Sequence, residues 1–146
     1  GIGLYGVDTN AKFQDHLQPL STLKTSISQI KKIKKGATIG YARKGLAQKN
    51  TRIAILAIGY ADGYDRRFSN GVGKVLINNQ LAPIIGNVCM DMCMANLGEI
   101  EAKEGDEVII FGAAPTISQL AQSINTIPYE ILTNVGQRVK RVFYSE

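Results

Sequence analysis

The sequence is poor in the residues that build cross-links and metal centres. Its 146 residues include two cysteines, one histidine, four prolines and no tryptophan. On one strand Cys89 and Cys93 would point to the same face but lie too far apart to bond to each other, and neither has the neighbouring His or Cys that a zinc site needs. We interpret them as buried, reduced thiols, which favours a cytoplasmic protein, and we expect no metal. The single histidine, His16, lies in a polar connection and is interpreted as a surface residue.

Long apolar runs are also missing. The longest, residues 53–61, has about half of the roughly 20 residues that a membrane-spanning helix requires, so we expect no membrane segment. The chain has no glycine-rich phosphate loop with a lysine, and its carboxylates form no obvious acid pair or catalytic triad. A composition of 45% hydrophobic and 20% charged residues is ordinary for a folded domain and excludes collagen-like and disordered chains.

Charge is the first feature that is present in excess. The net charge of +5, from 17 Lys and Arg against 12 Asp and Glu, makes a polyanionic partner a hypothesis to test. The lysines cluster before Gly36, where we interpret them as the solvated end of a strand and its turn. They lack the interleaved aromatic residues on which bases stack, so we expect no nucleic acid and keep a small basic β-domain that binds it as an alternative. The clustered residues are Lys31, Lys32, Lys34 and Lys35.

Alternating and β-branched patterns predict several short strands. Leu23, Thr25 and Ile27 alternate with polar neighbours, and Asn78-Asn79 is a pair typical of a tight turn between two strands. Short strands separated by turn residues are typical of a barrel or a sandwich. The predicted strands are residues 23–27, 53–58, 74–77, 81–88, 107–111 and 138–144.

The period of the pattern changes near the end of the chain. Thr116 with Gln119 forms a capping box, and apolar residues at helical spacing follow, which predicts one short amphipathic helix. Pro128 can occupy the first position of a further helical turn. The sequence therefore predicts a mainly β fold, a small β-barrel or β-sandwich-like domain with one or two short helices.

One tyrosine stands out by its position. Tyr60 follows the most apolar predicted strand and precedes a turn, so its phenol is expected at a rim of the domain. Tyrosines also anchor strand ends by packing the ring and leaving the hydroxyl in water. Spacing alone leaves both interpretations open.

Three segments resemble a known family. Residues 57–64 (AIGYADGY), 82–91 (APIIGNVCMD) and 127–132 (IPYEIL) resemble, in the same order, the signature segments of the C-terminal domain of alanine racemases. Residues 1–6 (GIGLYG) are similar to the segment where that family's N-terminal barrel ends, and residues 138–141 (RVKR) resemble its terminal Arg-Val-Pro-Arg stretch. The resemblance implies that residues 1–10 are the residual end of that barrel and a connection, and that residues 11–146 are the C-terminal β domain.

The resemblance also implies an activity. Enzymes of this family interconvert L- and D-alanine with pyridoxal phosphate, which a lysine of the N-terminal barrel holds. Inversion is best served by one base on each face of the planar intermediate, and the family uses that lysine on one face and a tyrosine from the other subunit of a head-to-tail homodimer on the other. The implied partners are the protein's own N-terminal barrel, a second full-length copy and a small amino-acid substrate. We expect this chain alone to hold no cofactor and to be inactive.

Four residues acquire roles from the resemblance. Tyr60 matches the catalytic tyrosine, and Met90 matches a residue whose backbone N–H donates to the substrate carboxylate. Tyr129 matches the tyrosine whose hydroxyl contacts the cofactor phosphate, and Ile2 matches a residue whose backbone N–H does the same. Asp91 is expected to order the loop that carries Met90.

The chain departs from the family pattern at two positions. Asn87 stands where Arg is common, and Lys140 stands where Pro is usual. A non-catalytic association module is the remaining alternative hypothesis, and it would tolerate Tyr60→Phe in the full-length protein without loss of turnover.

Overall fold

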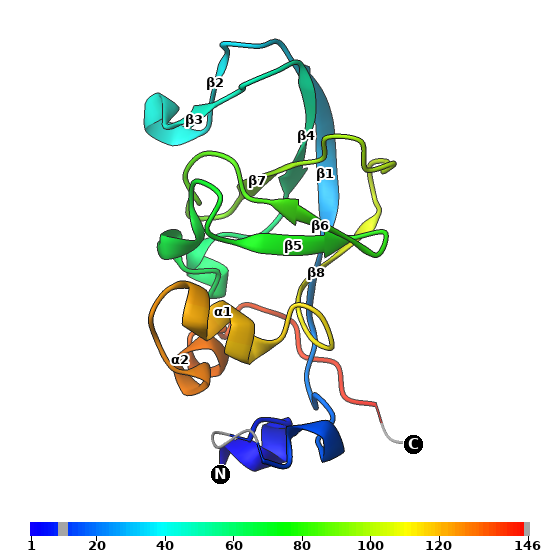
Figure 1. Cartoon of the computed structure of the whole chain (residues 1–146), viewed down its shortest axis with the longest axis vertical. Helices are drawn as coiled ribbons and strands as arrows, with labels where there is room; N and C mark the ends of the chain where they lie inside the picture. Colours follow the sequence, from blue (N-terminus) through cyan, green and yellow to red (C-terminus); the bar gives the residue numbers. More distant parts are fainter. Residues whose placement is uncertain (9–11, 145–146) are drawn as a thin grey trace.

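Strand pairing joins distant segments into one six-stranded antiparallel sheet with the order β6-β5-β8-β1-β4-β7 (Figure 1). The structure is a computed structural model that describes residues 1–8 and 12–144. An isolated bridge between Ile84 and Ala95 brings the two outer strands together, and Ile85 N–H donates to the Met94 carbonyl at 2.8 Å. The sheet is therefore nearly closed into a barrel, as the mainly β prediction required.

The strands are β1 (Leu23–Ile33), β2 (Thr38–Ile39), β3 (Gly45–Leu46), β4 (Thr51–Leu56), β5 (Lys74–Ile77), β6 (Gln80–Pro83), β7 (Cys93–Asn96) and β8 (Glu107–Phe111). The helices are α1 (Ile117–Ser123) and α2 (Pro128–Thr133). Short 3₁₀ helices are η1 (Ile2–Tyr5), η2 (Gln14–His16), η3 (Tyr41–Arg43), η4 (Tyr60–Asp62) and η5 (Arg66–Phe68).

Apolar side chains from every strand of the sheet fill the barrel. Val75 and Ile77 of β5 alternate with more exposed neighbours, as a half-buried strand requires. The β5–β6 hairpin turns at Asn78 and Asn79, which have φ angles of 47° and 61°. Asparagine tolerates this left-handed geometry, so the predicted tight turn is confirmed.

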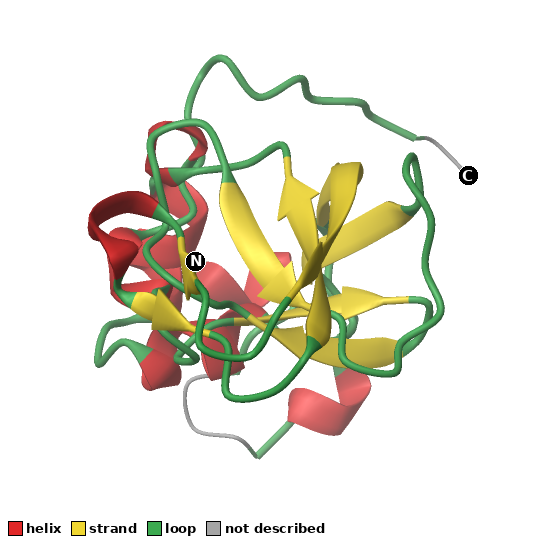
Figure 2. Ribbon diagram, turned by 90° about the horizontal axis from the view of Figure 1, so that it is seen from above, coloured by secondary structure: helices red, strands yellow, loops and turns green. Residues whose placement is uncertain are grey.

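The two helices begin where the sequence predicts. In α1, Gln119 N–H donates to the Thr116 hydroxyl at 3.2 Å and Thr116 N–H donates to the Gln119 side chain at 2.9 Å, which completes the predicted capping box. Pro128 is the first residue of α2. Both helices and most 3₁₀ turns lie on one side of the barrel (Figure 2).

A smaller apolar cluster supports the β2–β3 hairpin, which stands at the upper left of Figure 1. It is formed by Ile39, Ala47, Ile53 and Met94. Because Ile53 and Met94 belong to β4 and β7, the hairpin is fixed to the outside of the barrel by its own small core.

The predicted strand bounds differ from the structure at several places. The strand predicted over residues 53–58 is β4 at Thr51–Leu56, and the one predicted over residues 23–27 continues to Ile33.

Two further predictions fail over most or all of their length. Residues 138–144 form no strand, because β6 and β7 already close the sheet and the side chains of Arg138 and Arg141 are bonded elsewhere. The strand predicted over residues 81–88 ends at Pro83, and Gly86 has a φ of 76°, which no extended strand contains. The residues after this break form the loop that carries Met90.

No helix among the residues that the structure describes is long and apolar enough to cross a membrane.

Candidate active site

Tyr60 lies on an exposed turn directly after β4. Its side chain is 43% exposed, and the turn is fixed by two hydrogen bonds to the loop before β7. Tyr60 N–H donates to the Cys89 carbonyl and Ala61 N–H donates to the Met90 carbonyl, both at 3.0 Å. The segments that carry Tyr60 and Met90 are therefore in direct backbone contact, and the ring of Tyr60 is accessible from outside the domain.

Gly59 makes this contact possible. A Cβ atom at position 59 would lie 2.3 Å from the carbonyl oxygens of both Cys89 and Met90. Only glycine leaves room for the two backbones at this distance.

The loop of Met90 presents an unpaired amide. Cys89 N–H donates to the Met92 carbonyl at 2.9 Å, which closes a tight turn with Met90 at its tip. The Met90 side chain is 53% exposed, and its N–H donates to no acceptor in the described part of the chain. A backbone donor fixed by its fold and open to solvent is suited to bind an anion such as a carboxylate.

Asp62 orders the turn of Tyr60. One carboxylate oxygen accepts from Gly59 N–H at 2.9 Å, and the other accepts from Arg138 Nε at 2.7 Å. Partial burial raises the pKa of Asp62, but these hydrogen bonds and the nearby guanidinium charge outweigh it and hold the pKa below its usual value. Asp62 is therefore charged when it caps this turn.

A shallow cavity of about 300 Å³ adjoins Tyr60. Arg66 lies on its wall and donates to the Val88 carbonyl at 3.4 Å. The cavity is lined by Tyr60, Gly63, Asp65, Arg66 and Asn134.

Tyr129 lies on the first turn of α2 and is 45% exposed. The next residue, Glu130, pairs with Arg67 at 3.4 Å, and Arg67 also pairs with Asp65 at 2.8 Å. This chain of ion pairs links α2 to the segment that follows Tyr60. The structure therefore joins Tyr60, Met90 and Tyr129 to one group of neighbouring loops.

Ile2 is placed differently. Its side chain is buried in the main core, whereas Tyr60, Met90 and Tyr129 are exposed. No hydrogen bond within the described residues joins η1 to the segments that carry those three side chains. The Ile2 amide, in the first position of η1, has no acceptor among these residues.

Tyr41 is a candidate site residue that no sequence pattern singled out. This tyrosine lies in η3 on the β2–β3 hairpin and is 71% exposed. Ala42 and Arg43 after it have φ angles of 57° and 52°, a geometry that costs free energy in residues other than glycine and often occurs at functional sites. No simple sequence pattern indicates that an alanine and an arginine will adopt positive φ angles. The available signal was a tyrosine in the short stretch Gly-Tyr-Ala-Arg-Lys-Gly, which has no large apolar residue to bury its ring.

Asn87 connects this hairpin to the loop of Met90. Its amide donates to the Tyr41 carbonyl at 3.1 Å, and its oxygen accepts from Asn70 at 3.1 Å. Asn87 stands where the family commonly has Arg, and it is only 7% exposed. The asparagine at this position therefore makes a buried structural contact. Tyr41 therefore belongs to the same group of loops as Tyr60 and Met90.

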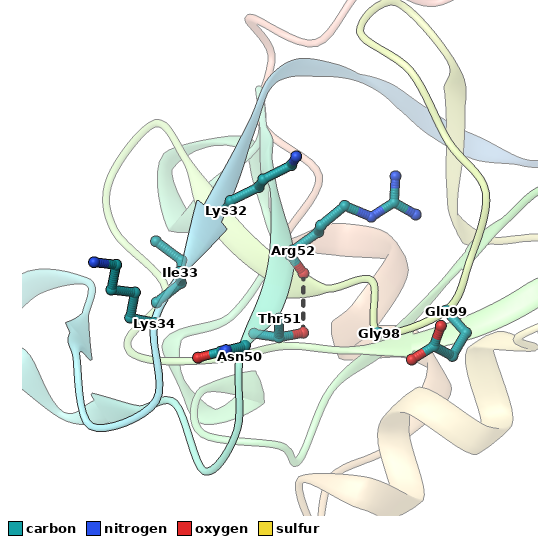
Figure 3. Close-up of a pocket in the computed structure, with 8 residues that line it drawn as sticks. All are labelled: Lys32, Ile33, Lys34, Asn50, Thr51, Arg52, Gly98 and Glu99. Atoms are coloured by element: carbon teal, nitrogen blue, oxygen red, sulfur yellow. Dashed lines mark hydrogen bonds between the residues drawn. The ribbon is translucent and has the colours of Figure 1, made fainter.

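The lysine cluster lies at the C-terminal end of β1, whereas β8 pairs with the N-terminal end of the same strand. The prediction that these lysines mark a strand end and its turn is confirmed. A depression of about 460 Å³ there is lined by Lys32, Lys34 and Arg52, with no aromatic residue among its eight (Figure 3). Lys34 points away from the other two cations (Figure 3), and Arg52 already donates to the Ile100 carbonyl at 2.6 Å. This surface gives the nucleic-acid alternative no stacking platform.

The two cysteines are both free thiols. Cys93 is buried as predicted, and burial raises its pKa to about 12, so it stays protonated. Cys89 is only half-buried, because it lies in the exposed loop of Met90. Within the described ranges, no group of three His, Cys, Asp or Glu side chains is arranged to hold a metal ion.

Comparison of the sequence with protein-family models and with known proteins identifies the same family in each case. The family model for "Alanine racemase, C-terminal domain" matches residues 20–143. The alanine racemase of Helicobacter pylori strain J99 is 46% identical over 151 aligned positions, which cover 98% of this chain and 40% of that protein. Alanine racemase 1 of Clostridium acetobutylicum is 41% identical, with 98% and 39% covered.

Solved structures agree with the sequence comparison. The alanine racemase of a D-cycloserine-producing Streptomyces lavendulae superposes with a TM-score of 0.93 at 35% identity and covers 100% of this chain and 40% of that one. That of Bartonella henselae, described with covalently bound pyridoxal phosphate, gives 0.93 at 34% identity, with 99% and 40% covered. The chain thus spans about two fifths of the length of these relatives.

Proposed function

Because this chain belongs to the alanine racemase family as its C-terminal domain, we propose that it completes the active site of an enzyme that interconverts L- and D-alanine. The observation that carries the proposal is the direct backbone contact between the turn of Tyr60 and the loop of Met90. It fixes an exposed phenol and an unpaired backbone N–H relative to each other. A phenol can exchange a proton at a carbon, and a fixed amide can hold the carboxylate beside that carbon.

The cofactor belongs to the full-length enzyme. Pyridoxal phosphate, when bound, withdraws electrons from the substrate carbon that loses its proton. The Tyr129 hydroxyl and the Ile2 backbone N–H fit a phosphate, because both are donors that have no partner in the described part of the chain. The part of the relatives that lies outside this chain supplies the lysine and the barrel, so we propose that the chain alone holds no cofactor and is inactive.

The chain's own residues then have defined tasks. The Met90 amide orients the substrate carboxylate, and the exposed phenol moves a proton on the face opposite the barrel lysine. A phenol that protrudes from its own domain is suited to reach the site of a second copy, so we propose that Tyr60 and Met90 act in the partner subunit of a homodimer. Tyr129 and Ile2 act in their own subunit.

Two tyrosines compete for the role of base. The family resemblance assigns it to Tyr60, which also lines a cavity. Greater exposure and the strained backbone after it favour Tyr41. We propose that the base is one of these two phenols and that the other lines the approach to the site.

Proton exchange in the full-length enzyme tests the function and assigns the base. The wild type should racemise alanine and exchange the α-hydrogen of both enantiomers with deuterium oxide. The Tyr→Phe variant that lacks the base should lose racemisation but still exchange one enantiomer, because the lysine still serves one face. The other variant should retain exchange of both. A wild type without racemase activity, or two Tyr→Phe variants that both exchange both enantiomers, would refute the proposal.

A further inference from the structure

Arg138 joins the turn of Tyr60 to the loop of Met90 through their carboxylates. Its Nε donates to Asp62 at 2.7 Å, and its Nη2 donates to Asp91 at 2.6 Å. Asp62 belongs to η4, Asp91 follows Met90, and Arg138 lies in the chain after α2. Three segments that are distant in sequence thus meet at one guanidinium.

Each carboxylate that Arg138 binds is next to a functional group. Asp62 accepts from Gly59 N–H at 2.9 Å and so caps the turn on which Tyr60 lies. Asp91 is the residue after Met90, so a bond to its side chain restrains the tip of the loop that presents the Met90 amide. A guanidinium can serve both at once because its nitrogens are arranged in a rigid plane, which a lysine ammonium lacks.

Arg138 is itself held in place. Gly136 N–H donates to the Asp62 carbonyl at 3.1 Å, and a Cβ at position 136 would lie 2.8 Å from the Ala61 carbonyl oxygen. Arg141 donates to the Val135 carbonyl at 3.1 Å, which adds a side-chain hydrogen bond within the same turn. The turn that carries Arg138 therefore docks on the turn of Tyr60, so the backbone of Arg138 is placed next to both carboxylates.

We propose that Arg138 is a positioning residue for the substrate carboxylate: by binding Asp62 and Asp91 together it fixes the Met90 amide relative to the turn of Tyr60. It also offsets the negative charge of Asp91, which would otherwise repel a carboxylate bound at the neighbouring amide. This inference rests on the proposed function.

A purely structural role explains the arrangement less well. The side chains of Arg138 and Asp91 are 49% and 58% exposed, and an ion pair this accessible contributes little to folding stability. Of the two carboxylates, only Asp62, at 16% exposed, is buried enough for its pair with Arg138 to stabilise the fold. The hydrogen bonds that Arg138 donates to Asp62 and Asp91 raise the pKa of Arg138 further above its already high value, so the residue stays charged over the whole range in which an enzyme is assayed. The pairs of Arg138 with Asp62 and Asp91 can, however, restrict how the loop of Met90 moves relative to the turn of Tyr60.

Kinetics of the full-length enzyme test the inference. Arg138→Gln should raise the KM for alanine about tenfold or more while kcat changes less than about threefold. The reason is that a misplaced Met90 amide weakens binding of the substrate carboxylate more than it affects the proton transfer. The inhibition constant of propionate, a carboxylate without an amine, should rise by a similar factor. The midpoint of thermal unfolding should fall by no more than about 5 °C, because of the two pairs that are lost only the one with the mostly buried Asp62 stabilises the fold.

A double variant shows whether Arg138 and Asp91 affect KM through their contact with each other or independently. Asp91→Asn alone should raise KM less than Arg138→Gln, and the double variant should be no worse than Arg138→Gln, because both changes break the same tether. Lys24→Gln is the matched control, since it breaks a 3.1 Å pair with Glu107 at 50% exposure on β1. It should leave KM unchanged.

Two results would overturn the inference: an Arg138→Gln enzyme with wild-type KM and propionate inhibition, or single-variant effects that multiply in the double variant. A wild-type enzyme that does not racemise alanine would instead refute the proposed function, so the two failures can be distinguished.

Discussion

The backbone N–H of Tyr60 donates a 3.0 Å hydrogen bond to the carbonyl of Cys89, so the position of the phenol is tied to the loop that presents the Met90 amide. The bond joins a turn after β4 to a loop before β7, and these strands pair in the barrel. The site is therefore an extension of the sheet. Its geometry depends more on the close contact between the backbones of the Tyr60 turn and the Met90 loop than on the Tyr60 side chain.

Gly59→Ala should separate these two backbones. The new Cβ would lie 2.3 Å from the Cys89 and Met90 carbonyl oxygens, so one segment must move. We expect a loss of about 1–3 kcal/mol in stability and a higher KM for alanine in the full-length enzyme. The wild-type enzyme is the reference for both measurements. If Gly59→Ala matches the wild type in unfolding midpoint and in KM, the close approach of the two backbones does not require glycine at this position.

Asp62 should make stability depend on pH. Its pKa is lower in the folded chain, so the unfolded chain binds protons more readily. The stabilisation is present above the ordinary Asp pKa of about 4 and is lost as the pH falls through the lower folded value. Thermal unfolding of the wild type should therefore weaken between about pH 5 and pH 2 more steeply than that of Asp62→Asn. Parallel curves for the two proteins would contradict the assignment.

Tyr64→Phe should leave the fold intact or stabilise it. The Tyr64 hydroxyl is buried without a hydrogen-bond partner in the described part of the chain, and burial raises its pKa well above the usual value. Removing this desolvated group should change stability by between zero and about +1 kcal/mol, since the ring still stacks on Phe68 at 4.7 Å. Tyr5→Phe, at an exposed tyrosine, should have no effect. A marked destabilisation by Tyr64→Phe would show that the hydroxyl has a partner, such as a buried water.

Local patterns predicted most of the fold. Strands such as Glu107–Phe111, the Asn78-Asn79 turn and the Thr116–Gln119 cap depend on neighbouring residues, so the sequence reveals them directly. Residues 138–144 looked like a strand, but barrel closure by Ile84 and Ala95 occupies the edge that such a strand would need. Which edges remain open depends on the whole sheet, and a local pattern does not contain that information.

The site was less predictable than the fold. Tyr60, Met90 and Tyr129 were selected by family resemblance, and the structure joins their loops through hydrogen bonds and ion pairs that no spacing rule contains. Tyr41 was overlooked because its distinguishing features are exposure and the positive φ angles of the residues after it. Both features belong to the three-dimensional backbone of the connection between β2 and β3, which a local residue pattern does not contain.

Mixed dimers test most directly whether this domain completes the active site of a second copy. One full-length variant would lack the cofactor-binding lysine of the N-terminal barrel, and the other would lack the tyrosine, Tyr60 or Tyr41, that the exchange experiment identifies as the base. Each variant alone should be inactive. If the tyrosine acts across the dimer, one of the two sites in each mixed dimer is intact, and mixing should restore up to about a quarter of wild-type racemase activity, since half of the dimers are mixed. Mixed dimers that form but remain inactive would show that the tyrosine serves its own subunit and would contradict the account.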